Sequence, residues 1–123
     1  MLTPASSLRI LVCTVATDMR KNFDGLAAIV ESLGEDPLGG SLYLFRNRRG
    51  DRLKLLYWDG DGYALWYKRL ERGTFQLPVA IGDSAVISSA DLAMLLDGVD
   101  LTTIRRRPRY RRPTAPAARN AVA

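Results

Sequence analysis

Residues 52–70, RLKLLYWDGDGYALWYKRL, carry the strongest structural signal in the chain. Two runs, 52–58 and 63–70, are rich in leucine and aromatic residues, and Asp59-Gly60-Asp61-Gly62 separates them. Asp-Gly pairs supply the positive backbone angles that tight hairpin turns need. The sequence therefore predicts an antiparallel β-hairpin in the middle of the fold.

Further strands are predicted on both sides of this hairpin. Leu42–Arg46 is a strand that reaches the hairpin through the turn Asn47-Arg48-Arg49-Gly50. After the hairpin, Glu71-Arg72-Gly73 turns the chain into a short strand over residues 74–77. These segments together predict a β-meander.

The N-terminal part predicts a strand followed by a helix. Leu8–Val15 is apolar and predicts a buried strand. Thr17 and Asp18 offer N-cap oxygens to a helix that ends at Gly34. Three- and four-residue spacing puts the following side chains on its buried face: Met19, Phe23, Leu26, Ala27, Val30 and Leu33.

A second helix is predicted near the C-terminus. Residues 85–87 predict a short edge strand or a lead-in to the helix, and Ser88 with Asp91 forms a capping box for a helix over residues 89–97. The fold class is therefore α+β: an antiparallel β-meander sheet packed by two helices, with a disordered basic C-terminal tail. Residues 1–104 form a single domain and residues 105–123 form the tail.

The positive charge is concentrated in that tail. The chain has 18 basic and 13 acidic residues, and seven arginines and no acid follow residue 104. The remaining 11 basic residues are outnumbered by the acidic ones, so the tail alone makes the protein basic. With three prolines and few large apolar groups, the tail buries too little surface to fold.

A dense arginine run neutralises phosphates and gives salt-sensitive affinity for nucleic acid. Binding to an acidic protein surface and a solvated tail without a partner are the alternatives. The arginines assigned to nucleic-acid binding here are Arg105, Arg106, Arg107, Arg109, Arg111 and Arg112.

A second basic cluster lies inside the domain, and we assign it to nucleic-acid binding together with the tail. A solvated sheet face and turn is the alternative explanation. The residues of this cluster are Arg46, Arg48, Arg49, Arg52, Lys54, Lys68, Arg69 and Arg72.

Several function classes are disfavoured. The chain has no histidine, which excludes a Ser-His-Asp triad and a Cys/His zinc site. No glycine-rich phosphate loop is found, and Cys13, the single cysteine, is expected to be a buried apolar residue. We therefore expect no catalytic residues, no metal and no cofactor. Without an apolar run of membrane-spanning length or a signal peptide, we expect a cytoplasmic protein.

Two other clusters have simpler explanations than chemistry. Asp59 and Asp61 belong to the hairpin turn, because the later ligands of a calcium loop are missing. A metal-dependent nuclease using Asp18, Asp24 and either Asp51 or Asp59 is the least favoured hypothesis. The aromatic residues near the hairpin are expected to pack, although one or two on the outer face could stack on bases; they are Trp58, Tyr63, Trp66 and Tyr67.

Three stretches of this sequence resemble a known family. They are TDMRKNFDGL (17–26), FRNRRGDRLKLLYWDG (45–60) and WYKRLERGTF (66–75), with LAMLLDG (92–98) near the end. Together they resemble the TnpB-type accessory protein, the second open reading frame of IS66-type insertion sequences, over residues 8 to 101. Asn22 stands where that family has glycine, and Leu77 where it commonly has tryptophan.

The resemblance implies a non-catalytic accessory protein encoded beside a separate transposase. We therefore expect a DNA-associated protein of transposition whose partners are DNA at the element ends, the transposase and a sister accessory protein. The alternative is a protein-interaction adaptor that binds the transposase without contacting DNA itself.

Overall fold

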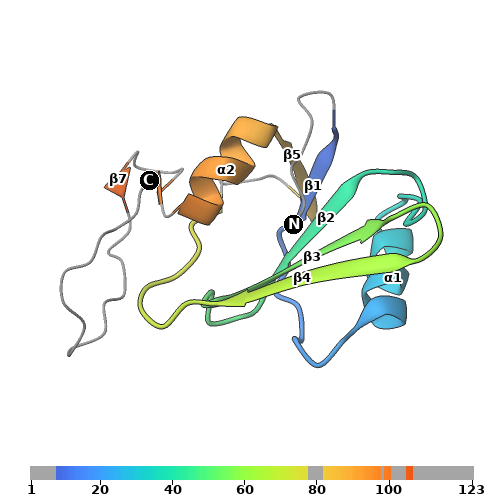
Figure 1. The fold of residues 1–123 in the computed structure, drawn as a ribbon. Coiled ribbons are helices and arrows are strands. Elements are labelled where there is room, and N and C mark those ends of the chain that lie inside the picture. Colours follow the sequence, from blue (N-terminus) through green and yellow to red (C-terminus); the bar gives the residue numbers. More distant parts are fainter. Residues whose placement is uncertain (1–7, 78–81, 98, 101–104, 107–123) are drawn as a thin grey trace.

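The structure, a computed structural model, describes residues 8–77, 82–97, 99–100 and 105–106 (Figure 1). No helix among these residues is long and apolar enough to cross a membrane. In chain order the elements are β1 (Ile10–Cys13), α1 (Phe23–Ser32), β2 (Leu42–Arg46), β3 (Arg52–Trp58), β4 (Tyr63–Arg69), β5 (Ser84–Ile87), α2 (Ser89–Asp97), β6 (Val99–Asp100) and β7 (Arg105–Arg106).

The main sheet has five strands in the order β4-β3-β2-β1-β5. The α+β class and the two helices are confirmed, but the prediction of a purely antiparallel sheet is wrong, because β1 and β2 are parallel. The other pairs are antiparallel. A helical crossover returns the chain to the same end of the sheet and allows parallel pairing, and α1 is that crossover here.

Each face of the sheet is covered by one helix, as Figure 1 shows. This arrangement explains why β1 and β2 are apolar on both faces. The core between the sheet and α2 contains Ile10, Val12, Leu42, Leu44, Leu53, Leu55, Phe75, Ile87, Leu92 and Leu95. The core on the α1 face contains Leu11, Cys13, Leu26, Ala27, Val30, Tyr43, Phe45 and Leu56.

The central hairpin is confirmed. Strands β3 and β4 pair from Arg52 opposite Arg69 to Trp58 opposite Tyr63. The turn between them is closed by a 2.8 Å bond from the Asp59 amide to the Gly62 carbonyl. Alternation within one hairpin is a local signal, so its register could be predicted from the sequence alone.

Helix α1 begins later than predicted, and the assignment of Thr17 and Asp18 as its N-cap is wrong. Thr17 is buried, and its amide donates to the Arg46 carbonyl at 2.9 Å, so this bond joins the loop after β1 to the end of β2. Phe23, predicted on the buried face, is 44% exposed at the first position of the helix. The tertiary bond of Thr17 therefore overrides the local capping signal.

The C-terminal end of α1 is confirmed at Gly34. The Gly34 amide donates to the Glu31 carbonyl at 3.0 Å, and the Glu35 amide donates to the Val30 carbonyl at 3.2 Å. These two bonds form a Schellman motif, which needs a left-handed residue, and Gly34 has a φ of 80°.

Helix α2 and its capping box are confirmed. The Asp91 amide donates to Ser88 Oγ at 3.0 Å, and the Ser88 amide donates to Asp91 Oδ2 at 3.3 Å. Leu92 and Leu95 are buried against the sheet. Strand β5, directly before the helix, lies at the edge of the sheet as expected.

The segment after β4 differs from the prediction, because residues 74–77 form no strand. Phe75 is instead fixed by a 2.8 Å bond from its amide to the Gly50 carbonyl. Farther along, β6 and β7 form a separate two-stranded sheet. Arg105 and Arg106, the first residues of the predicted tail, are therefore in a strand, and residues 107–123 lie outside the described part of the chain.

Candidate nucleic-acid interface

Two turns meet at the end of the sheet where β2 and β4 end. The Leu70 amide donates to the Asp51 carbonyl at 2.7 Å, and the Phe75 amide donates to the Gly50 carbonyl at 2.8 Å. These bonds join the turn between β2 and β3 to the segment after β4. Basic residues that are distant in sequence are thereby brought to one end of the molecule.

The β2–β3 turn is fixed by its own side chains. Asn47 Oδ1 accepts from the Arg52 amide at 2.9 Å, and Asn47 Nδ2 donates to Asp51 Oδ1 at 2.8 Å. The bond from Asn47, together with the charges of Arg49 and Arg52, lowers the pKa of Asp51. Gly50 has a φ of 80°, which favours glycine at this position.

Arg48 and Arg49 lie on this turn, and both are exposed. Within the described part of the chain, neither forms an ion pair. Arg72 is also exposed, on the neighbouring turn. These three side chains remain available to an external anion.

Pairing across the strands separates the remaining basic residues into two groups. Arg52 and Arg69 lie directly opposite each other on the α1 face. Arg46 and Lys68 both lie opposite Leu53, which belongs to the α2-side core. The sequence cluster is therefore not one continuous patch.

Arg46 and Lys54 have structural roles. Arg46 is half-buried and donates to the Phe75 carbonyl at 2.7 Å, and burial lowers the pKa of its guanidinium. Lys54 is only 3% exposed. The assignment of Lys54 to phosphate binding therefore fails, because a buried ammonium cannot reach a phosphate.

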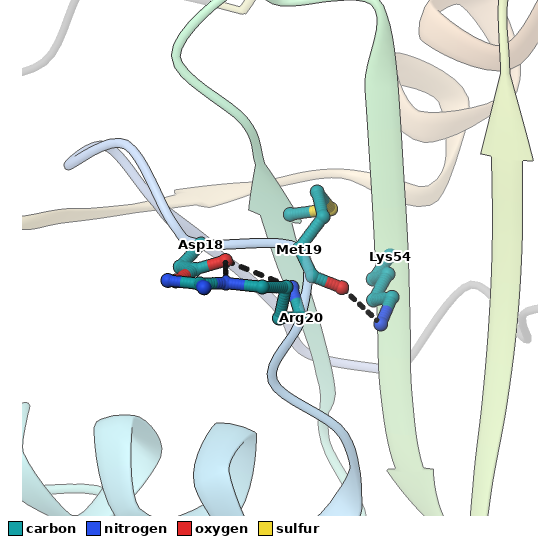
Figure 2. A network of polar contacts seen from close by, with 4 residues as sticks. All are labelled: Asp18, Met19, Arg20 and Lys54. Atoms are coloured by element: carbon teal, nitrogen blue, oxygen red, sulfur yellow. Dashed lines mark hydrogen bonds and ion pairs between the residues drawn. The ribbon is translucent and has the colours of Figure 1, made fainter.

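The Lys54 ammonium holds the loop before α1, as Figure 2 shows for its bond to Met19. It donates to the Met19 carbonyl at 2.9 Å, the Lys21 carbonyl at 2.7 Å and Asn22 Oδ1 at 3.2 Å. An ammonium group has three protons, so these acceptors use all of them. Asn22, which stands where the resembling family has glycine, supplies one of the three.

Asp18 and Arg20 form an ion pair on the same loop (Figure 2). Arg20 Nη2 lies 2.7 Å from Asp18 Oδ2, and the Arg20 amide donates to Asp18 Oδ1 at 2.9 Å. The guanidinium of Arg20 lowers the pKa of Asp18 to about 2. The carboxylate therefore stays ionised and is neutralised by its own loop.

This loop and the β2–β3 turn enclose an open hollow of about 310 Å³. Three arginines and two carboxylates line it, and Asp18 is paired with Arg20 while Asp51 is bonded to Asn47. The wall is thus basic with an apolar contribution from Met19. Its lining residues are Thr17, Asp18, Met19, Asn47, Arg48, Arg49, Asp51 and Arg52.

The aromatic residues of the hairpin are divided between packing and exposure. Trp58 and Tyr63 pack edge to face with ring centroids 5.2 Å apart, and Trp66 packs against the α2-side core. Tyr67 is 47% exposed beside Arg52. The sequence placed Tyr67 in a packing cluster from which one or two rings could stack on bases. Alternation along β4 puts it on the same face as Tyr63 and Leu65 of the α1-side core, so no local signal indicated that it is exposed.

The remaining arginine assignments cannot be compared with side-chain positions. Arg105 and Arg106 lie in β7, of which only the backbone is described, and Arg107, Arg109, Arg111 and Arg112 lie outside the described residues. Within the described ranges, no group of three acidic, cysteine or histidine side chains could hold a metal ion.

Comparison with known proteins identifies the family to which this chain belongs. The model of the family described as "IS66 Orf2 like protein" matches residues 8–106. Two uncharacterized proteins of Sinorhizobium fredii (strain NBRC 101917 / NGR234) are similar. One, y4jC, is 40% identical over 115 residues, covering 93% of this chain and 97% of its own. The other, y4hO, is 45% identical over 101 residues, covering 81% and 88%. No solved structure matches.

Proposed function

Because the chain belongs to the family of IS66 Orf2-like proteins, we propose that it is a non-catalytic accessory protein of transposition that contacts DNA directly. The family supports a role in transposition beside a separate transposase. DNA contact, the element ends as its target and the absence of catalysis are the further parts of this proposal.

One observation carries the proposal of DNA contact. Arg48, Arg49 and Arg52 lie together at one end of the sheet, and Arg69 lies directly opposite Arg52. Arg69 is paired with Glu71 at 2.9 Å, whereas Arg48 and Arg49 form no ion pair within the described residues. A phosphate backbone that binds these guanidinium groups would release counterions.

The test is a titration of the full-length protein onto a labelled element-end duplex and a scrambled duplex between about 50 and 200 mM salt. We expect the affinity to fall steeply as salt rises. Arg49→Ser should lower the slope of log affinity against log salt by about 1, since one phosphate contact is lost.

Arg9→Ser is the matched control. It changes the net charge equally, but Arg9 lies just before β1 and pairs with Glu35 at 2.6 Å, outside the proposed interface. The slope should stay at the wild-type value in this variant. A full-length protein without salt-dependent affinity for either duplex would refute DNA contact.

The contribution of the tail is measured by serine substitution of Arg107, Arg109, Arg111 and Arg112 in the full chain. If these substitutions abolish the affinity and Arg49→Ser does not lower it, the tail is a non-specific tether. If the substituted protein still prefers the element-end duplex to the scrambled duplex, the folded domain recognises the DNA sequence.

Strand β5 favours the adaptor alternative. It lies at the edge of the sheet and exposes 59% of Val86, and an edge strand can pair with a strand of another protein. In that case the transposase should be recovered in a pull-down that resists nuclease and moderate salt. Val86→Lys should abolish this recovery.

A further inference from the structure

Tyr67 differs from the other aromatic residues of the hairpin because it lies on the α1 face without being covered. Tyr67 is 47% exposed on the edge strand β4. Its partner across the strands is Lys54, and Arg52 lies two residues before Lys54 on the same face. An exposed aromatic ring among cations is the usual composition of surfaces that bind single-stranded nucleic acid.

The ring is held in place from two sides. The Lys54 ammonium lies 4.7 Å from the ring centroid, and three hydrogen bonds fix that ammonium in turn. Arg52 Nη1 donates to the Tyr67 hydroxyl at 3.0 Å. Because Lys54 lies under one side of the ring, the exposed surface belongs to the other side. The ring is therefore a fixed platform that loses little entropy on binding.

Two arginines, Arg52 and Arg69, lie beside this platform on the same face of the sheet. Arg69 lies across from Arg52, two residues along β4 from Tyr67. Its guanidinium is paired with the exposed Glu71 at 2.9 Å, so a phosphate would take the place of that carboxylate. Arg52 also lines the basic hollow with Arg48 and Arg49. A strand whose base covers the ring therefore meets guanidinium groups within reach of its own phosphates.

We propose that Tyr67 stacks on an unpaired base of single-stranded DNA while Arg52 and Arg69 bind the adjacent phosphates. This inference rests on the proposed function and specifies its ligand. Bases of an intact duplex stack on each other, so their faces are not open to the ring. Only an unpaired segment offers a free base face together with its phosphates.

The experiment uses the full-length protein and a labelled single strand of about 15 thymidines, an abasic strand of equal length and a blunt duplex. Tyr67→Leu keeps the apolar bulk and removes the aromatic face, and Tyr67→Phe keeps the face and removes the hydroxyl. We expect Tyr67→Leu to bind the thymidine strand about tenfold more weakly and Tyr67→Phe to stay within about twofold of wild type.

The abasic strand and the duplex separate stacking from charge. Neither offers a free base to the ring, so Tyr67→Leu should bind both as the wild type does. A single strand carrying 2-aminopurine gives a second readout, since stacking quenches its fluorescence. We expect quenching with wild type and Tyr67→Phe and none with Tyr67→Leu.

Equal binding of the thymidine strand by wild type and Tyr67→Leu would overturn the proposal, and so would an equal loss on all three ligands. Both results leave the proposed function standing if the wild-type protein still binds the duplex in a salt-dependent way. Loss of that duplex binding is the separate result that would refute the proposed function.

Discussion

Lys54 is the residue in which sequence and structure differ most. In the sequence it continues a run of basic side chains, and nothing nearby marks it as buried. Its three acceptors belong to Met19, Lys21 and Asn22, more than thirty positions earlier. No local pattern encodes such contacts, so the sequence could predict its strand and its face but not its role. The loop before α1 depends on this one ammonium group.

Replacing Lys54 by methionine should therefore destabilise the fold. The substitution keeps most of the side-chain volume but leaves three acceptors without their donor, and we expect a loss of about 2–3 kcal/mol in the free energy of unfolding. Urea unfolding at neutral pH measures it. Lys21→Met is the control, since this exposed side chain should change stability by about 0.5 kcal/mol or less. A Lys54→Met protein as stable as this control would contradict the structural role.

The two helices show which element boundaries a sequence can specify. The capping box of α2 lies within four residues, and both of its bonds form as expected. The cap predicted for α1 fails, because Thr17 bonds to β2 and Asp18 bonds to Arg20. Local signals thus predict a boundary where no tertiary partner competes for the same groups. The hairpin of β3 and β4 follows the same rule.

Removing the Ser88 hydroxyl should weaken the start of α2. Ser88→Ala loses the bond to the Asp91 amide, and we expect a cost of about 1 kcal/mol. Thermal unfolding followed by circular dichroism measures this loss. Ser89→Ala changes the neighbouring serine, which has no capping bond, so its melting temperature should stay close to that of wild type. Equal shifts in the two variants would argue against the capping role.

The Schellman motif at the end of α1 should make Gly34 sensitive to substitution. A Cβ at Gly34 would meet no atom within 4 Å, so the cost of Gly34→Ala comes from its φ of 80° alone. We expect about 1 kcal/mol of destabilisation in urea unfolding. Gly62→Ala is the comparison, because that site is equally open and has no positive φ. A larger loss at Gly62 than at Gly34 would be inconsistent with this explanation.

At the scale of the molecule, the mixed sheet was the feature that the sequence did not predict. Uniformly apolar residues in β1 indicate a strand buried on both faces, and the structure confirms this burial. They do not indicate which strand lies beside it or in which direction. That choice depends on where α1 carries the chain, which is a property of the assembled core. The basic surface was predicted as a set of residues, and strand pairing then divided it between two faces.

Acid should destabilise the molecule through three carboxylates that are hydrogen-bonded in the folded state. Bonds from Arg20, Arg9 and Asn47 lower the pKa values of Asp18, Glu35 and Asp51 in the folded state. Since the folded pKa lies below the unfolded one, each group stabilises the fold above about pH 4 and loses this contribution toward pH 2. The urea midpoint should therefore fall over that range, and less steeply in high salt because exposed pairs are screened.

Arg20→Gln tests the largest of these shifts. Without the guanidinium, an NMR titration should find the pKa of Asp18 moved from about 2 toward its usual 3.8. Arg48→Gln serves as the control and should leave the titration of Asp18 unchanged. If the pKa of Asp18 stays near 2 without Arg20, a group other than Arg20 lowers it.

The pairing of β1 with β5 has a consequence for synthesis of the protein. Ile10, in the first strand of the main sheet to leave the ribosome, lies opposite Ile87, in the last. Pairing between distant segments forms late, so a nascent chain leaves the apolar edge of β1 uncovered until β5 has been made. A gene copy interrupted before codon 84 would encode a product that never covers this edge. Such truncated products are expected to aggregate or to be degraded, and not to act as smaller versions of the same protein.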